Sequence, residues 1–83
     1  MNPHRFQLDK PFIELHALLK LLAIAPSGGA AKAMIAAGEV RVDGSVETRK
    51  ACKIRGGQTV RVADEEVRVV AADQPVVLNS AVT

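Results

Sequence analysis

Several residue types are scarce or missing in this chain of 83 residues. Tryptophan and tyrosine are absent, and Phe6 and Phe12 are the only aromatic residues, so no platform for stacking unpaired bases is evident. Cys52 is the only cysteine, which excludes a disulfide within the chain and favours a cytoplasmic location. No run of about 18 apolar residues occurs, and the N-terminus has no apolar run before its charges, so we expect neither a membrane span nor a signal peptide.

Groups that carry catalysis or bind metals are also scattered. Acidic residues cluster only at residues 64–66, where we expect a solvated turn. His4, His16 and Cys52 lack ligand-like spacing, so no metal and no other cofactor is expected. Cys52 is expected to be a small buried residue, and no serine–histidine–acid arrangement is supported by spacing. The sequence therefore predicts a protein that is not an enzyme and has no small-molecule substrate.

The first forty residues predict two helices. One is expected to begin near Asp9, which can cap free N–H groups, with Pro11 in its first turn. The second is expected to begin after Ser27, a good N-cap, and to end at Gly38 in the left-handed conformation. Apolar residues at helical spacing form one stripe for the core, namely Phe12, Leu15, Leu18, Leu19 and Leu22.

Strands are indicated elsewhere, because the apolar period changes to two after the second helix. Val40 and Val42 should face the core while Arg41 faces away, and Asp43-Gly44 is typical of a tight turn. A short strand is also expected at residues 6–8. In a second hairpin, Val60 and Val62 should oppose Val67 and Val69 across a polar loop at residues 63–66.

The order of these elements predicts the fold class. Helices followed by strands indicate an α+β domain in which two helices pack on a small, mostly antiparallel sheet. We expect residues 1–70 to form this single domain. Residues 71–83 should form a C-terminal tail that either adds a strand or frays.

Positive charge is concentrated in one segment, although the net charge is only +2. Between residues 41 and 61 there are six basic residues against two acidic ones. Such a segment fits a surface for phosphate backbones, and it equally fits a solvated sheet face. Without an aromatic platform, a nucleic acid would be read through its backbone and shape, which suits folded RNA. The six residues are Arg41, Arg49, Lys50, Lys53, Arg55 and Arg61.

The start of the second expected helix could also meet an anion. Its sequence "SGGAAK", residues 27–32, lacks the spacing of a phosphate loop. The backbone N–H groups at Gly28 and Gly29 are nevertheless open, the helix dipole favours an anion there, and Lys32 lies about one turn away. A plain N-cap with glycines in the turn accounts for the same residues, so both interpretations stay open.

The segments "LDKPFIELHALLKLL" and "SGGAAKAMIAAGEVRVDGSVETRKACKIRGGQTVRV" together resemble the S-four RNA-binding domain, or αL motif. The resemblance covers residues 8–62 and is greatest to the small stand-alone bacterial members, the YbcJ-like group. It implies a protein whose second helix and following hairpin dock on structured RNA, with ribosomal RNA as the expected ligand. Two positions differ from many members of the family. Those members have an arginine where this chain has Gly28 and an acidic residue where it has Gln58. The residues implied to contact RNA are Ser27, Gly28, Gly29, Lys32, Arg41, Arg49, Lys50, Lys53 and Arg55.

An alternative function from another class is a protein-interaction adaptor. The apolar residues 76–78 in the tail, or an edge of the sheet, could pair with a partner protein. For either function we expect a monomer that does not bind membranes.

Overall fold

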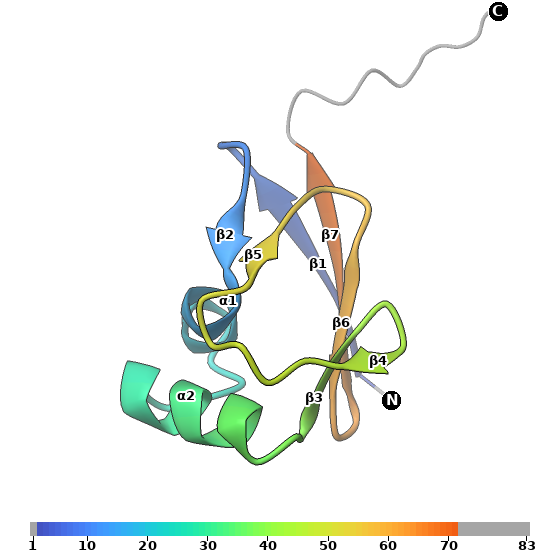
Figure 1. Ribbon diagram of the computed structural model, residues 1–83. Coiled ribbons are helices and arrows are strands. Elements are labelled where there is room, and N and C mark those ends of the chain that lie inside the picture. Colours follow the sequence, from blue (N-terminus) through green and yellow to red (C-terminus); the bar gives the residue numbers. More distant parts are fainter. Residues whose placement is uncertain (1, 72–83) are drawn as a thin grey trace, which may run out of the picture.

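Two helices and two sheets make up the computed structural model, which describes residues 2–71 (Figure 1). The predicted α+β class is confirmed, whereas the tail predicted at residues 71–83 lies, apart from Ala71, outside the described residues. In chain order the elements are β1 (Asn2–Leu8), β2 (Ile13–Glu14), α1 (Leu15–Leu21), α2 (Gly28–Ala36), β3 (Val40–Val42), β4 (Ser45–Val46), β5 (Lys53–Ile54), β6 (Thr59–Val62) and β7 (Glu65–Ala71).

The larger sheet has five strands in the order β1-β7-β6-β3-β4. Its pairs are antiparallel except β1 with β7, which run parallel from Asn2 beside Glu65 to Leu8 beside Ala71. The prediction of a mostly antiparallel sheet is therefore confirmed. The smaller sheet pairs β2 with β5, and Ile13 lies opposite Ile54.

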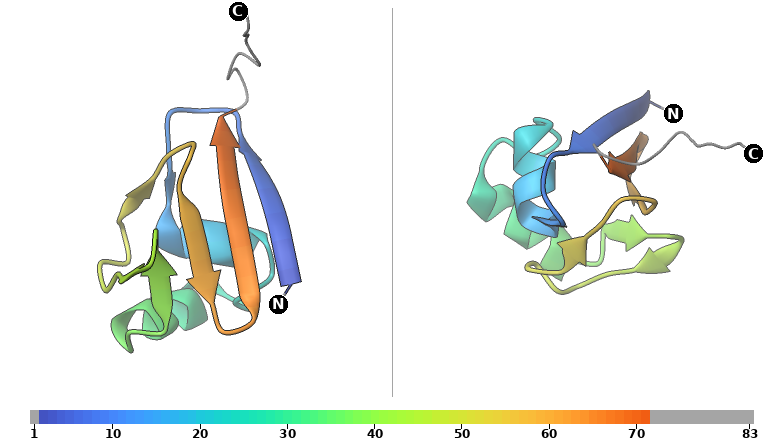
Figure 2. Two further views of the ribbon diagram at one scale, coloured as in Figure 1. Left: turned by 90° about the vertical axis from the view of Figure 1, so that its right-hand side faces the viewer. Right: turned by 90° about the horizontal axis from the view of Figure 1, so that it is seen from above.

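Both helices cover the same face of the five-stranded sheet. Figure 1 shows them beside the sheet, and the left view of Figure 2 shows the opposite face, from here on the outer face, with no helix in front of it. Each fully buried aliphatic side chain between these layers contributes roughly 1.5–3 kcal/mol. The fully buried large side chains are Leu15, Leu18, Leu19, Ile35, Val40, Ile54, Val60, Val67 and Val69. Neither helix of the described chain is long and apolar enough to span a bilayer.

Helix α1 begins at Leu15, so the predicted start near Asp9 is wrong. Residues 9–11 form a bend, and Ile13 pairs with Ile54 before the helix starts. Glu14 occupies the N-cap position with an extended backbone and no capping hydrogen bond from its side chain. A strand pair between distant residues has thus overridden the local capping signal at Asp9.

Helix α2 follows its prediction at both ends. The Ser27 hydroxyl accepts a hydrogen bond from the Ala30 backbone N–H at 3.1 Å, which makes Ser27 the N-cap. At the other end Gly38 has a φ of +77°, and its N–H donates to the Ile35 carbonyl. A left-handed residue suits glycine best because glycine lacks a Cβ.

The two hairpins agree with the sequence pattern in different degrees. Asp43 and Gly44 both have positive φ, +52° and +87°, as the predicted tight turn between β3 and β4 requires. The loop between β6 and β7 contains only residues 63–64, so the predicted loop at 63–66 is too long. Its two glutamates belong to β7, and the register places Val60 opposite Val67 but Val62 opposite Glu65.

Candidate nucleic-acid interface

The segment between β4 and β5 is fixed against the first turn of α1. The Leu15 N–H donates to the Cys52 carbonyl at 2.9 Å, and the His16 N–H donates to the Lys50 carbonyl at 3.1 Å. The first N–H groups of a helix have no partners within the helix. Carbonyls of the distant segment therefore replace the missing N-cap side chain, and they hold Lys50 beside the start of α1.

Lys53 and Arg55 flank a half-buried aromatic ring. Because Ile54 between them is fully buried, both cations are exposed. The Lys53 Nζ atom lies 5.1 Å and the Arg55 Cζ atom 5.7 Å from the centroid of the Phe12 ring. Exposed cation–π contacts are worth about 0.5–1 kcal/mol each. The ring thus positions two of the predicted phosphate-binding side chains.

Phe12 itself was not predicted to act at this place. Its spacing put it in the apolar stripe of the first helix, but it precedes β2 and α1. The contact depends on the pairing of β2 with β5, which no local pattern indicates.

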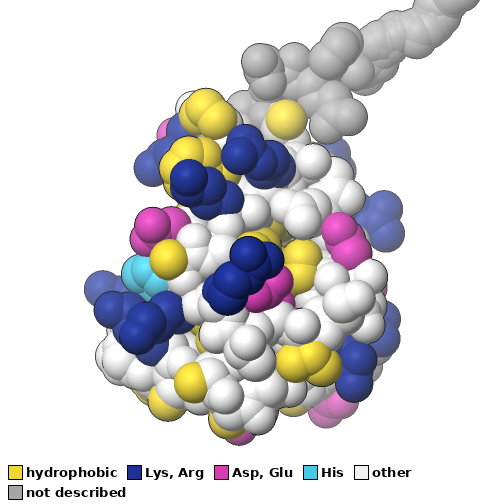
Figure 3. Space-filling model, viewed as in Figure 1, with side chains coloured by type: hydrophobic (Ala, Val, Ile, Leu, Met, Phe, Trp, Pro, Cys, Tyr) yellow, Lys and Arg dark blue, Asp and Glu magenta, His cyan; other side chains and the backbone are white. Residues whose placement is uncertain are grey.

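Lys50, Lys53 and Arg55 are called the basic edge below. Figure 3 shows Lys and Arg side chains gathered over β5 and the segment before it.

Arg49 lies in the same segment but is held by a carboxylate. The Arg49 Nε and Nη2 atoms donate to the two carboxylate oxygens of Glu47 at 2.9 and 3.2 Å, and the Arg49 N–H donates to Oε2 at 3.0 Å. These hydrogen bonds lower the pKa of Glu47 to about 2. The carboxylate therefore stays charged near neutral pH, and Arg49 is largely neutralised before it meets a ligand.

The Glu47→Gln variant should release Arg49 and bind RNA more tightly. One additional phosphate contact should steepen the salt dependence by roughly 0.7–0.9 log units and raise the affinity by about threefold to tenfold at low salt. Binding titrations at several salt concentrations measure both quantities. The matched control is Glu39→Gln, which removes an equal charge at an exposed residue after α2. An equal gain in the two variants would show that only net charge matters.

The predicted residues Ser27, Gly28, Gly29 and Lys32 lie at the start of α2. Ser27 acts as the N-cap, so the predicted cap is confirmed. A phosphate contact at this helix start stays a prediction. Apart from its chain neighbours and the backbone of its own helix, no atom lies within 4 Å of where a Cβ on Gly28 would be, so the backbone is open to a ligand at that residue. Lys32 is exposed. Figure 1 and the left view of Figure 2 place α2 on the same side of the molecule as the segment before β5.

Arg41 is separated from this group by the sheet. Its neighbours Val40 and Val42 are buried toward the helices, so Arg41 projects from the outer face. There it lies opposite Arg61 of β6, and its Nη1 atom donates to the Gly44 carbonyl at 3.3 Å. Of the nine predicted residues, Arg41 is therefore the one that the structure places on another surface.

Gln58 holds the turn after β5, where the family resemblance implies an acidic residue. Its side-chain oxygen accepts a hydrogen bond from the Arg55 N–H at 2.7 Å. The Gln58 N–H donates in return to the Arg55 carbonyl at 3.3 Å. An amide oxygen can accept this backbone hydrogen bond as a carboxylate would, so the end of β5 is held in place.

Cys52 is half-buried and packs against the core. Burial raises the pKa of its thiol, and the nearby Glu47 carboxylate raises it further. The thiol therefore stays protonated and weakly nucleophilic near neutral pH. Within residues 2–71, no three His, Cys, Asp or Glu side chains are grouped so that they could hold a metal ion.

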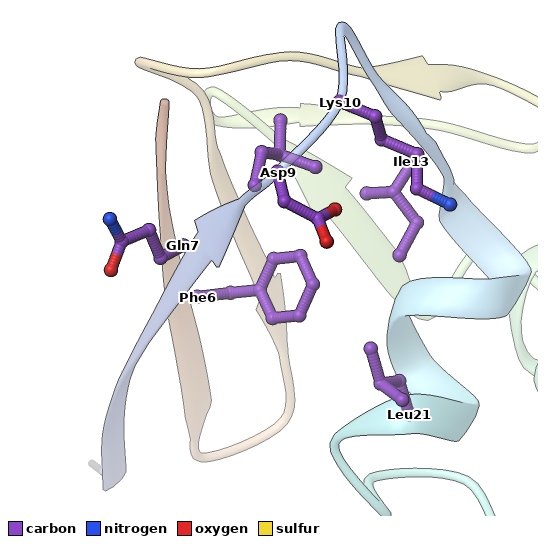
Figure 4. Close-up of a pocket in the computed structure, with 7 residues that line it drawn as sticks. Phe6, Gln7, Asp9, Lys10, Ile13 and Leu21 are labelled. Carbon is purple, nitrogen blue, oxygen red and sulfur yellow. The ribbon is translucent and has the colours of Figure 1, made fainter. Parts of the chain in front are cut away.

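Phe6, the second aromatic residue of the chain, lines a hollow between β1 and α1. Figure 4 shows Phe6, Ile13 and Leu21 directed toward this hollow, with Gln7 pointing away from it. Phe6 and Ile13 pack against the core, whereas Leu21 is exposed. Phe6 thus joins β1 to the core and lines one side of this hollow.

Known proteins resemble this chain in sequence and in fold. The S4 domain family matches residues 6–70. A protein of Escherichia coli (strain K12) named "Putative RNA-binding protein YbcJ" is 57% identical over 67 residues, which cover 80% of this chain and 96% of that protein. "Uncharacterized protein YbcJ" of Shigella flexneri matches to the same extent. A solution structure of YbcJ from E. coli, described as revealing an αL motif involved in RNA binding, is 54% identical, covers 86% of this chain and 91% of its own, and superposes with a TM-score of 0.67.

Proposed function

Because this chain belongs to the S4 domain family, we propose that it binds structured RNA, with ribosomal RNA as its ligand in the cytoplasm. The protein acts as a monomer and without catalysis, as a module that docks on the phosphate backbone. The observation that carries this proposal is the basic edge, in which Lys50, Lys53 and Arg55 lie together near the start of α1.

The cations of the basic edge are available to a ligand. Among the ion pairs of residues 2–71, none involves Lys50, Lys53 or Arg55, and all three side chains are exposed. A phosphate that approaches them therefore displaces water and counterions but no protein carboxylate. Release of counterions is the main source of affinity in contacts of this kind.

Helix α2 extends the proposed surface with one cation and an open backbone. The exposed Lys32 projects from the helix, and the first turn at Gly28 and Gly29 leaves backbone N–H groups for an anion. The family resemblance implies an arginine where this chain has Gly28. Here close approach of a phosphate to the backbone takes the place of that side chain.

The test is a titration of a labelled ribosomal stem-loop RNA at several salt concentrations. Four free cations, Lys32, Lys50, Lys53 and Arg55, predict that log K falls by roughly 3 for each tenfold increase in salt. An unrelated stem-loop and an unstructured strand serve as comparisons. Absence of binding at low salt would contradict the proposal, and equal affinity for the unstructured strand would contradict its preference for folded RNA.

The alternative function, a protein-interaction adaptor, rested on the apolar residues 76–78 or on an edge of the sheet. Residues 76–78 lie outside the described residues. The edges of the five-stranded sheet are β1 and β4, and the exposed large apolar side chain on them is Val46 of β4. A single exposed valine does not favour a particular partner, so RNA binding is the function that the site supports best.

A further inference from the structure

The outer face of the five-stranded sheet carries one arginine on each of four adjacent strands. All four side chains are exposed, and neither helix within residues 2–71 covers this face (Figure 2, left). None of the four belongs to the proposed RNA-binding surface described above, because Arg41 lies on this face as well. The arginine face consists of Arg5 on β1, Arg68 on β7, Arg61 on β6 and Arg41 on β3.

Strand register brings these arginines together in two pairs. Arg5 lies beside Arg68 in the parallel pair β1–β7, and Arg41 lies opposite Arg61 in the antiparallel pair β3–β6. Paired strands are about 4.8 Å apart, so both side chains of a pair leave the sheet next to each other. Like charges placed opposite each other destabilise a sheet. Packing therefore does not explain why arginine occupies both positions of both pairs.

Carboxylates on this face compensate the arginines only in part. Glu66 forms an ion pair with Arg61 at 3.3 Å. Asp43 uses its carboxylate to accept a hydrogen bond from the Thr59 N–H at 2.9 Å, which is a contact that supports the sheet. The ion pairs within residues 2–71 include none that involves Arg5 or Arg68. An excess of positive charge therefore remains, and it is greatest at Arg5 and Arg68.

Each arginine pair also borders a shallow hollow in the outer face. Arg5 and Arg68 line one hollow, and Arg41 and Arg61 line the other. Glu66 lies between the two and lines both. A guanidinium group presents a planar fork of N–H donors that matches two oxygens of one phosphate. Each pair can thus hold one phosphate, and no aromatic side chain lies on this face to read a base.

We propose that the arginine face binds the phosphate backbone of a second RNA segment, so that the protein holds RNA on two sides. This inference rests on the proposed function, because the basic edge and α2 bind the first segment. The second contact uses only phosphates and is therefore independent of base sequence. A small domain with two such surfaces brings two RNA segments together instead of only coating one.

The test uses two short stem-loop RNAs, one labelled with a fluorescence donor and one with an acceptor. The unmodified protein should produce energy transfer between them. The Arg5→Gln/Arg68→Gln variant should lose most of this transfer while its affinity for a single stem-loop stays within about twofold, since loss of two phosphate contacts affects only the second surface. Its thermal unfolding should not occur at lower temperature, because a like-charge pair is removed.

The control variant Lys10→Gln/Lys20→Gln removes the same charge from two exposed lysines that belong to neither surface, although Lys10 lies in the hollow beside Phe12, and it should keep the energy transfer. If the protein binds one stem-loop but gives no transfer, or if Arg5→Gln/Arg68→Gln leaves the transfer unchanged, the second surface is wrong and the proposed function stands. If no stem-loop is bound at low salt, both proposals fail. Light scattering on the same samples shows whether a dimer accounts for the transfer.

Discussion

Simultaneous replacement of Lys50, Lys53 and Arg55 by alanine should lower the affinity for structured RNA by roughly 30-fold to 100-fold near 0.1 M salt. These side chains are exposed, lie near the start of α1 and form no ion pair within residues 2–71. Their loss removes three of the four free cations assigned to the first RNA segment. The dependence of log K on log salt should become shallower by about 2 to 2.7. Titrations at three or more salt concentrations measure both effects.

A charge-conserving variant provides the control for this experiment. Lys50→Arg, Lys53→Arg and Arg55→Lys together keep three cations and the contacts with Phe12, so the affinity should stay within about threefold of the original. Circular dichroism should show that both variants fold, because the replaced side chains are exposed. Unchanged affinity in the alanine variant would mean that RNA binds elsewhere on the protein.

The second large effect concerns stability. Ile54 is fully buried, pairs with Ile13 and lies between Lys53 and Arg55. Ile54→Ala should reduce the free energy of unfolding by about 2–5 kcal/mol, because it removes buried methyl groups and leaves a cavity. A small domain has a total of only about 5 kcal/mol to lose. Denaturant unfolding followed by circular dichroism measures the change.

The milder variant Ile54→Val distinguishes the contribution of Ile54 to core packing from its role in positioning the basic edge. It removes one methylene group and should reduce the free energy of unfolding by only about 0.5–1.5 kcal/mol. RNA affinity should be nearly unchanged in Ile54→Val, since the basic edge stays in place. A loss below about 1 kcal/mol in Ile54→Ala would show that the site collapses around the smaller side chain and that β5 is not anchored by Ile54.

Features set by neighbouring residues were predictable from the sequence. The cap at Ser27, the left-handed Gly38 and the turn at Asp43-Gly44 each depend on a few adjacent residues, and all three were confirmed. The start of α1 was predicted wrongly because it depends on a pair, Ile13 with Ile54, that is distant along the chain. Capping propensity of about 1 kcal/mol is too weak to compete with such a pair and the core behind it.

In the candidate site, too, features set by neighbouring residues were predictable, whereas features that depend on distant residues were not. Charge density together with the family resemblance pointed to Lys50, Lys53 and Arg55, but the separation of Arg41 from them required knowledge of which face of β3 is buried. Phe12 escaped notice because its ring meets Lys53 and Arg55 only after β2 and β5 have paired. Arg5 and Arg68 belong to opposite ends of the domain, and no window of sequence contains both.

The parallel pair of β1 and β7 has a consequence for the order in which the protein folds. Asn2 pairs with Glu65 and Leu8 with Ala71, so every contact of this pair closes a loop of more than sixty residues. Such contacts form late, because the loss of chain entropy precedes their stabilisation. On a growing chain β1 has no partner until β7 is synthesised. The helices and the basic edge can assemble earlier, whereas the adjacent placement of Arg5 and Arg68 exists only once the sheet is complete.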